Sequence, residues 1–171
     1  MENINHYQNK DFRFVLNRLP TVEYFASVAE IPSIGGSPIL VPNPFVPIQV
    51  PGESLDYAPY PLTFRIDEDF RNYEEILLWF QSYGAPHSFD QYKQGEPNTK
   101  KVVKSKVSDG TLILPTSKYN ANIRFVFEDM FPINLSGLSL DLTDETVPVL
   151  VCTVTFSYTK FTLQRSPLPG T

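Results

Sequence analysis

Hydrophobic and less hydrophobic residues alternate along several segments of the chain. In the segment Phe12–Asn17, for example, Phe12, Phe14 and Leu16 occupy every second position. A period of two is typical of β-strands with one buried face. The other segments that predict strands are Val22–Ala29, Leu62–Asp67, Thr111–Leu114, Ile123–Glu128, Leu138–Leu142 and Val149–Leu163. The expected fold is therefore mainly β, an antiparallel sandwich or small barrel.

The last alternating segment predicts the longest strand, and its two faces differ in character. Together with Leu138–Leu142 it is expected to form a C-terminal antiparallel hairpin. One face of the segment Val149–Leu163 is apolar and includes Cys152, Val154 and Phe156. The other face is small and polar, which suits a wetted surface better than a core. Its polar residues are Thr153, Thr155, Ser157 and Thr159.

One segment has the period of a helix. From Asn72 to Tyr83, apolar residues recur at helical spacing, and this predicts one α-helix flanking the strands. Asn72 with Glu75 three residues later resembles a capping box. The expected buried stripe is Tyr73, Ile76, Leu77 and Phe80, with Trp79 beside it.

Residues 31–61 form a long proline-rich arm. They contain eight of the sixteen prolines in the chain, and proline fixes φ and removes a backbone donor. Such an arm is extended and ordered in advance, so it can reach a partner at low entropic cost. The alternative is a surface loop that folds back on its own barrel. The arm carries apolar residues that need cover, and these are candidate subunit contacts: Ile39, Leu40, Val41, Phe45 and Val46.

A second polar segment, residues 88–109, is rich in lysine. Runs of this kind are usually solvated loops. The sharper hypothesis is a second interaction segment in which Lys100, Lys101 and Lys104 meet acidic groups of a neighbouring subunit.

Length and charge restrict the class of protein. The 171 residues predict a single domain over residues 1–171, and 42% hydrophobic residues supply a core. A net charge of −5 argues against tight binding of a nucleic-acid backbone, which needs clustered Lys and Arg. The N-terminal residues lack the pattern of a signal peptide, and no apolar run is long enough to span a bilayer. We expect a soluble protein, with no membrane association, made in a reducing compartment.

Candidate catalytic chemistry is scarce. Cys152 is the only cysteine, so neither an intrachain disulfide nor a cysteine zinc cage can form. The two histidines, His6 and His87, have no visible metal or nucleophile partner in the sequence. No glycine-rich loop is followed by a helix in the way that phosphate binding requires. The sequence therefore predicts a protein that is not an enzyme and needs no cofactor or metal.

An ordered set of segments carries a resemblance to a known family. It comprises the strand Phe12–Asn17, the run Phe25–Pro32, the arm ending Val50–Glu53, the run Phe64–Ile76 with Trp79, the run Phe131–Leu138 and a long strand through Phe156–Tyr158. Together these segments resemble the tail tube proteins of contractile-tailed bacteriophages and their baseplate and terminator paralogues. The resemblance covers roughly residues 12–163.

The resemblance implies a β-barrel or sandwich with a flanking helix that assembles into hexameric rings. In such rings the inner sheets join into one larger barrel, and the rings stack into a tube that conducts DNA without binding it specifically. Under this hypothesis Thr153, Thr155, Ser157 and Thr159 face the lumen. The partners would be other copies of the chain and sheath, baseplate or neck proteins, in a virion assembled in the host cytoplasm.

Two alternatives stay open at this point. The chain could form a single ring at one end of the tail, as a baseplate tube initiator or as a tail terminator or completion protein. It could also be a monomeric β-sandwich that binds a ligand through exposed aromatic residues such as Tyr57, Tyr60 and Tyr92.

Overall fold

The computed structural model describes residues 11–16, 18–19, 22, 25–84, 106–115, 121–140 and 149–165. The main strands are β1 (Arg13–Leu16), β2 (Ala26–Ala29), β7 (Tyr60–Arg65), β8 (Ser108–Pro115), β9 (Ala121–Leu135), β10 (Val151–Ser157) and β11 (Lys160–Arg165). Four short strands lie in the proline-rich arm: β3 (Ile34–Gly36), β4 (Ile39–Val41), β5 (Ile48–Val50) and β6 (Leu55–Tyr57). The helix α2 (Arg71–Gly84) follows β7.

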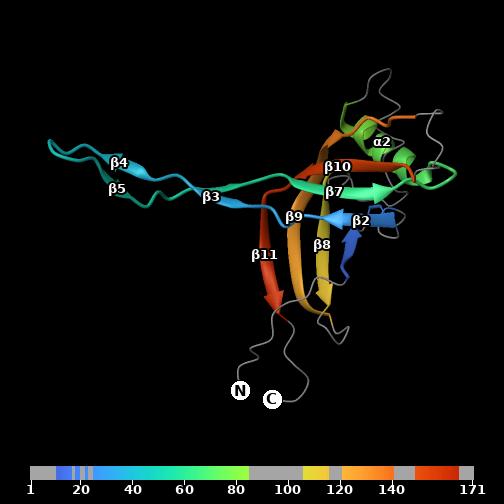
Figure 1. The fold of residues 1–171 in the computed structure, drawn as a ribbon, viewed down its shortest axis with the longest axis horizontal. Helices are drawn as coiled ribbons and strands as arrows, with labels where there is room; N and C mark the ends of the chain where they lie inside the picture. Colours follow the sequence, from blue (N-terminus) through green and yellow to red (C-terminus); the bar gives the residue numbers. More distant parts are fainter. Residues whose placement is uncertain are drawn as a thin grey trace, which may run out of the picture.

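The main strands form one antiparallel sheet that bends into two layers. The strand order is β1-β8-β9-β10-β7-β2, and β11 also pairs with β9. The first part of β9 pairs with β8 and β11, whereas its last part pairs with β10. We call the first group (β1, β8, β9, β11) the β8 layer and the second (β9, β10, β7, β2) the β10 layer. In Figure 1 the strands of the β8 layer run across those of the β10 layer. This is the predicted mainly β antiparallel architecture with a flanking helix.

β9 makes the corner between the two layers. It is 15 residues long, more than twice the segment that alternation predicts. Asp129 has a positive φ of 55°, in the left-handed region that short polar side chains tolerate best. Its backbone N–H donates to the Asp109 carboxylate at 3.3 Å. A bend of this kind lets one strand serve two crossed sheets.

Aromatic rings fill the space between the layers. Tyr60 is fully buried, with its ring centroid 4.8 Å from that of Phe127 and 5.2 Å from that of Phe14. The apolar face of β10 points into this core, since Cys152, Val154 and Phe156 are all buried. The side chains that sequence alternation assigned to the inside of β10 are therefore the ones that lie there.

The C-terminal hairpin differs from the prediction. Leu138–Leu140 are not in a strand, Leu140 is 73% exposed, and residues 141–142 lie outside the described part. β10 instead pairs with Phe131–Leu135 of β9. The predicted strand Val149–Leu163 also breaks after Ser157, because β11 turns to pair with the other layer. The alternation runs through the bend and so gives no sign of it. In the N-terminal region, the predicted strand Val22–Ala29 shortens to β2.

The helix lies where the sequence predicts it, but it is rotated. Its buried residues are Asn72, Ile76, Trp79 and Ser82, whereas Leu77 is 40% exposed. The capping box is also wrong, because the helix begins at Arg71 and Asn72 is fully buried. The Asn72 amide donates to the Arg65 carbonyl at 2.7 Å and so connects α2 to the end of β7.

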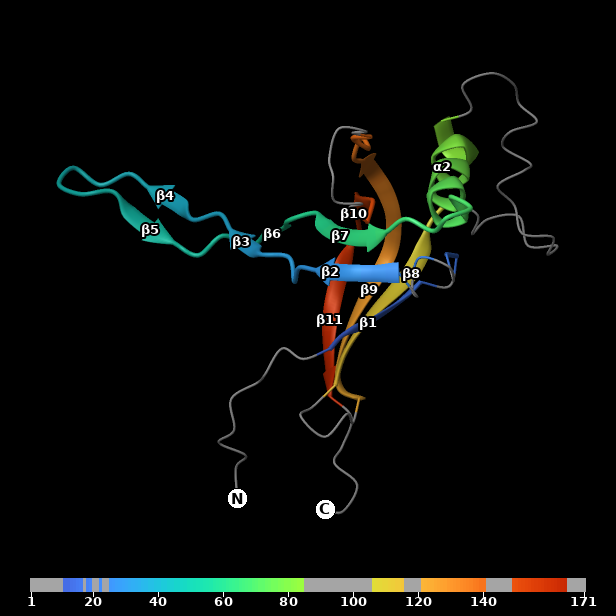
Figure 2. The ribbon, with the colours of Figure 1, turned by 45° about the vertical axis from the view of Figure 1, so that its right-hand side comes forward.

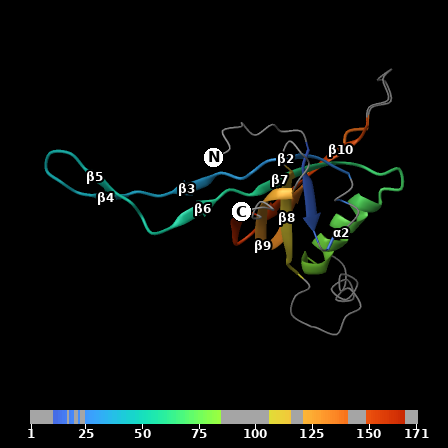
Figure 3. The ribbon, with the colours of Figure 1, turned by 90° about the horizontal axis from the view of Figure 1, so that it is seen from below.

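The proline-rich arm is a β-hairpin that extends away from the rest of the protein. β3 pairs with β6, and β4 pairs with β5, each in antiparallel register. All three figures that show the whole chain place the arm and α2 at opposite ends of the protein (Figures 1, 2 and 3). Within the described part of the chain, the strands of the arm pair only with one another, as expected for a segment whose prolines interrupt a sheet.

Candidate assembly surfaces

The arm carries a dense set of uncovered apolar side chains. Phe45 is 93% exposed and Val46 67% exposed at its turn, and every residue of β4 and β5 is exposed. The five residues that the sequence offers as subunit contacts all lie here, on β4 and at the turn: Ile39, Leu40, Val41, Phe45 and Val46. Monomeric proteins rarely expose contiguous apolar surface of this extent without a function in binding.

Specific contacts hold the arm in shape. At the turn, the Phe45 N–H donates to the Asn43 side-chain oxygen at 3.3 Å. Halfway along, Gly52 lies so close to the Ser37 carbonyl oxygen that a Cβ would clash with it. The arm is therefore a preformed projection, which lowers the entropic cost of binding through it.

The base of the arm is anchored in the core by aromatic residues. The Tyr158 hydroxyl donates to the Ala58 carbonyl at 2.8 Å, and the Tyr57 and Tyr158 rings meet edge to face at 6.1 Å. Burial, followed by the nearby Tyr57, raises the pKa of Tyr158 to about 12. Tyr57 also contacts Phe161 of β11, at a centroid distance of 5.7 Å. These contacts fix the direction in which the arm leaves the two layers.

The outer face of the β10 layer is small and uncharged at its centre. Thr153 lies opposite Thr63 of β7, and their hydroxyl oxygens are 2.9 Å apart. Thr155 lies between Pro61 and Asn134, and Ser157 continues the same row of partly exposed residues. We call Thr63, Thr153, Thr155, Ser157 and Asn134 the polar face. Thr159, the fourth residue of the predicted lumen set, is exposed but lies after the end of β10, at the bend.

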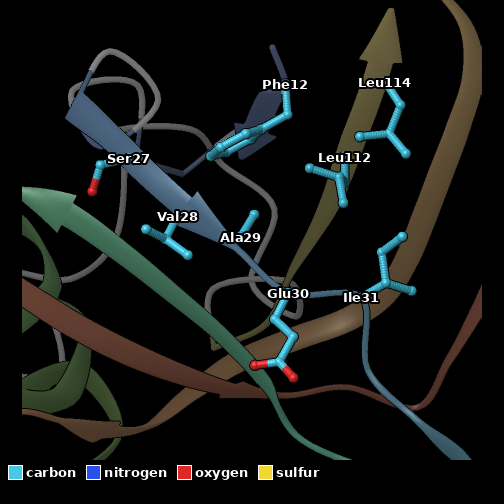
Figure 4. Close-up of a pocket in the computed structure, with 8 residues that line it drawn as sticks. All are labelled: Phe12, Ser27, Val28, Ala29, Glu30, Ile31, Leu112 and Leu114. Carbon is cyan, nitrogen blue, oxygen red and sulfur yellow. The ribbon is translucent and has the colours of Figure 1, made fainter. Parts of the chain in front are cut away.

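An apolar groove lies where the main sheet fails to close. β1 and β2 are the two ends of the strand order, and a cavity of about 490 Å³ separates β2 from β1 and β8. Phe12, Leu112 and Ala29 face one another inside it, and Ile31 extends its apolar wall toward the arm (Figure 4). The Glu30 carboxylate points away from these side chains. We call this hollow the seam groove; its full lining is Phe12, Ser27, Val28, Ala29, Glu30, Ile31, Leu112 and Leu114.

The described residues offer little for catalysis. None of them forms a group of three or more His, Cys, Asp or Glu side chains that could hold a metal ion. Burial raises the pKa of Cys152, which is a buried side chain of the core and so a poor nucleophile. In the part of the chain that the structure describes, no helix is long and apolar enough to cross a membrane.

The structure brings the predicted residues into two separate groups. The apolar arm residues form one, and Thr153, Thr155 and Ser157 form the other, while Lys100, Lys101 and Lys104 lie outside the described residues. Sequence reasoning missed the seam groove, because its two walls are far apart in the chain. It also missed that the arm is a hairpin, although the alternation of Ile39 with Val41 and of Ile48 with Val50 was a signal for strands.

Comparison with solved structures identifies the fold. No protein-family model matches the chain. A chain of the sheath–tube complex of an extracellular contractile injection system (PVC, extended state) is similar over 94% of this chain and 93% of that chain, with a TM-score of 0.60 and 13% identity. The sheath/tube terminator of the same system gives a TM-score of 0.59 at 10% identity, over 95% of this chain and 99% of that chain. The fold is therefore the one found in tail tube-like proteins of contractile systems.

One curated relative adds a similarity in sequence. The tail tube terminator protein of Enterobacteria phage T4 is 27% identical over 117 residues, which is 68% of this chain. The match spans 62% of the length of the T4 protein. The chain thus resembles the structural proteins of contractile phage tails, in agreement with the ordered segments of its sequence.

Proposed function

We propose that the protein is a tail tube terminator of a contractile-tailed bacteriophage. In this proposal it forms a single sixfold ring that ends the tail tube and leaves an open channel for DNA. The observation that carries the proposal is the sequence similarity to the T4 terminator, because the structural likenesses are below 25% identity and support the fold alone.

The arm supports assembly into rings. Among the described residues, its strands pair only with each other, its apolar side chains are exposed, and it points away from the body (Figure 1). An apolar projection on one side of a subunit makes a contact that is not self-complementary. Repetition of such a contact generates closed rings or open stacks rather than two-fold dimers.

The polar face supports a lumen at the β10 layer. Its central residues are hydroxyl and amide side chains without charge, so they wet the surface but offer no cation to a phosphate backbone. The net charge of −5 adds a weak general repulsion. DNA would pass along such a wall without binding to it specifically. Thr153, Thr155 and Ser157 are proposed to line it.

The proposed partners follow from the proposed position of the protein at the end of the tube. They are further copies of the chain, the last ring of the tail tube, and sheath or neck proteins. The ring would be part of the virion after assembly in the host cytoplasm, and it would act as a structural protein and not as an enzyme.

A second candidate is the repeating subunit of the tube. It is favoured by the apolar arm, because a contact that is not self-complementary can generate open stacks of rings as well as one closed ring. The two candidates differ in where the protein sits and in how many rings it forms.

Labelling of tail tubes separates them. Purified, gold-labelled protein is incubated with tail tubes that lack their terminator and is viewed by negative-stain electron microscopy. A terminator labels one end of each tube and stops further growth. Label incorporated along the length of growing tubes would instead identify the repeating subunit.

A further inference from the structure

The seam groove is a preformed apolar socket at the base of the arm. Its volume of about 490 Å³ lies within the range of about 300–1,000 Å³ that is typical of ligand pockets. The side chains that face one another in it are apolar, and the single carboxylate, Glu30, is turned away (Figure 4). Ile31, on its wall, is 46% exposed. The socket therefore gains most from an uncharged, apolar occupant.

The tip of the arm has the properties of such an occupant. We call residues 44–47 (Pro-Phe-Val-Pro) the arm tip. Phe45 is 93% exposed, and the chain from Ile31 to Gly52 contains no charged residue. Two flanking prolines and the bond from the Phe45 N–H to Asn43 hold the turn before it meets a partner. One phenyl ring with a neighbouring valine is small enough for the groove and large enough to fill much of it.

The tip cannot reach the groove of its own chain. Ile31, which forms part of the groove wall, is the first residue of the arm, whereas Phe45 lies at its far end (Figures 1 and 4). An arm tip that fills the groove must therefore come from another copy of the chain. Because every copy carries both a tip and a groove, these contacts can repeat around a closed ring.

The dimensions allow this within one ring. The thirteen residue-to-residue steps of extended chain from Ile31 to Pro44 span up to about 43 Å at about 3.3 Å per step. The four strands of the β10 layer are about 19 Å wide at about 4.8 Å per strand, which sets the spacing of copies around a channel that these layers line. The arm is long enough to reach the next copy even when it leans away from the plane of the ring. Groove and arm root lie at the same end of β2, so they share one side of the ring.

We propose that the arm tip of each subunit inserts Phe45 into the seam groove of the neighbouring copy in the same ring. This inference rests on the proposed assembly into rings, and it names the surface that the arm binds. The partner is a second copy of this chain.

Short-range cross-linking tests the contact. Two full-length variants, Phe45→Cys and Ile31→Cys, are purified separately, mixed, and treated with a bismaleimide that has a two-carbon spacer. Native Cys152 is 1% exposed and provides the unreactive background in the parent. The expected result is a band at twice the monomer mass that needs both variants and is absent when either is treated alone.

Two matched variants show whether the groove itself is engaged. Leu163→Cys is the matched control: Leu163 is 49% exposed, close to the 46% of Ile31, but it lies on β11, which pairs with β9 and contributes no residue to the groove lining. Paired with Phe45→Cys, it should give at least fivefold less product than Ile31→Cys. Ile133→Cys tests whether a different surface of the neighbouring copy fills the groove. Ile133 is 45% exposed on β9, at the opposite end of the β10 layer from β2. Efficient linkage of Ile133→Cys to Ile31→Cys, with none to Phe45→Cys, would overturn the proposal.

Electron microscopy of the same samples distinguishes a failure of this inference from a failure of the proposed function. Rings without linkage between Phe45→Cys and Ile31→Cys would refute the tip-in-groove contact while leaving the terminator proposal intact. Linkage in samples that form only open chains would uphold the contact and refute the ring.

Discussion

Trp79 joins the helix to the rest of the protein through three different contacts. Its ring lies 5.9 Å from that of Phe156, its Nε1–H donates to the Lys106 carbonyl at 2.9 Å, and the Arg18 guanidinium lies 5.0 Å from the ring centroid. The side chain is 1% exposed. Packing, a hydrogen bond and a cation–π contact therefore converge on one residue.

Replacing Trp79 with Ala should lower the free energy of unfolding by about 3–5 kcal/mol, because a large buried ring is lost. The matched variant Leu77→Ala, one residue position away from the buried stripe and 40% exposed, should cost less than about 1 kcal/mol. Urea unfolding followed by circular dichroism measures both. Equal losses in the two variants would mean that the helix is packed by its other face.

The raised pKa of Tyr158 predicts that the protein loses stability at alkaline pH. Its pKa is raised from 10.0 to about 12 in the folded protein, so the unfolded chain loses this proton first. The stabilising contribution is complete below pH 10 and falls as the pH rises from 10 to about 12. The variant Tyr158→Phe should lose less stability over this interval than the parent does. Parallel curves of unfolding free energy against pH for the two proteins would contradict the assignment.

At the scale of elements, the sequence predicted the position of the helix better than the side that it buries. The helical period located α2 within one residue at each end, yet the buried side runs through Asn72, Ile76 and Trp79 and not through Leu77. A stripe of apolar residues fixes a helix face only roughly when tryptophan and leucine lie side by side. The buried position of polar Asn72 could not be inferred, because it depends on the Arg65 carbonyl at the end of β7.

The strands show a similar limit. Alternation assigned the inner and outer residues of β10 correctly, since burial on one face is a local signal. It could not predict that β9 serves both layers, because the corner at Asp129 depends on a contact with Asp109, 20 residues away. Nor could it predict the seam groove, whose walls come from β2, β8 and the residue before β1.

The arm should be dispensable for folding and required for assembly. Deleting residues 38–51 joins Ser37 to Gly52, which already lie in contact, and removes β4, the turn and β5. Because β4 and β5 pair with each other and with no other described strand, the melting temperature of the monomer should change by no more than a few degrees. Size-exclusion chromatography with light scattering should then show monomers only. The control Gln49→Ala, which alters an arm residue without removing apolar surface, should assemble like the parent.

Two results of the deletion experiment would contradict this expectation, and each has a different meaning. A deletion variant that fails to fold would show that the arm stabilises its own subunit. A variant that folds and still forms rings would show that other surfaces suffice for assembly.

At the scale of the whole molecule, the arm, the polar face and the helix point in different directions. The arm and α2 lie at opposite ends of the protein (Figures 1 and 2). The polar face lies on the outer side of the β10 layer. In the proposed ring, the polar face would line the channel and the arms would project on one side only. The two sides of such a ring would differ, as a terminator requires if one side binds the tube and the other side does not.

Cryo-electron microscopy of the purified full-length protein tests this account most directly. The account predicts closed single-layer rings with sixfold symmetry, with Thr153 and Thr155 on the channel wall and Phe45 against a neighbouring copy. A protein that stays monomeric at high concentration, even with tail tubes present, would contradict it, as would long tubes of many stacked rings.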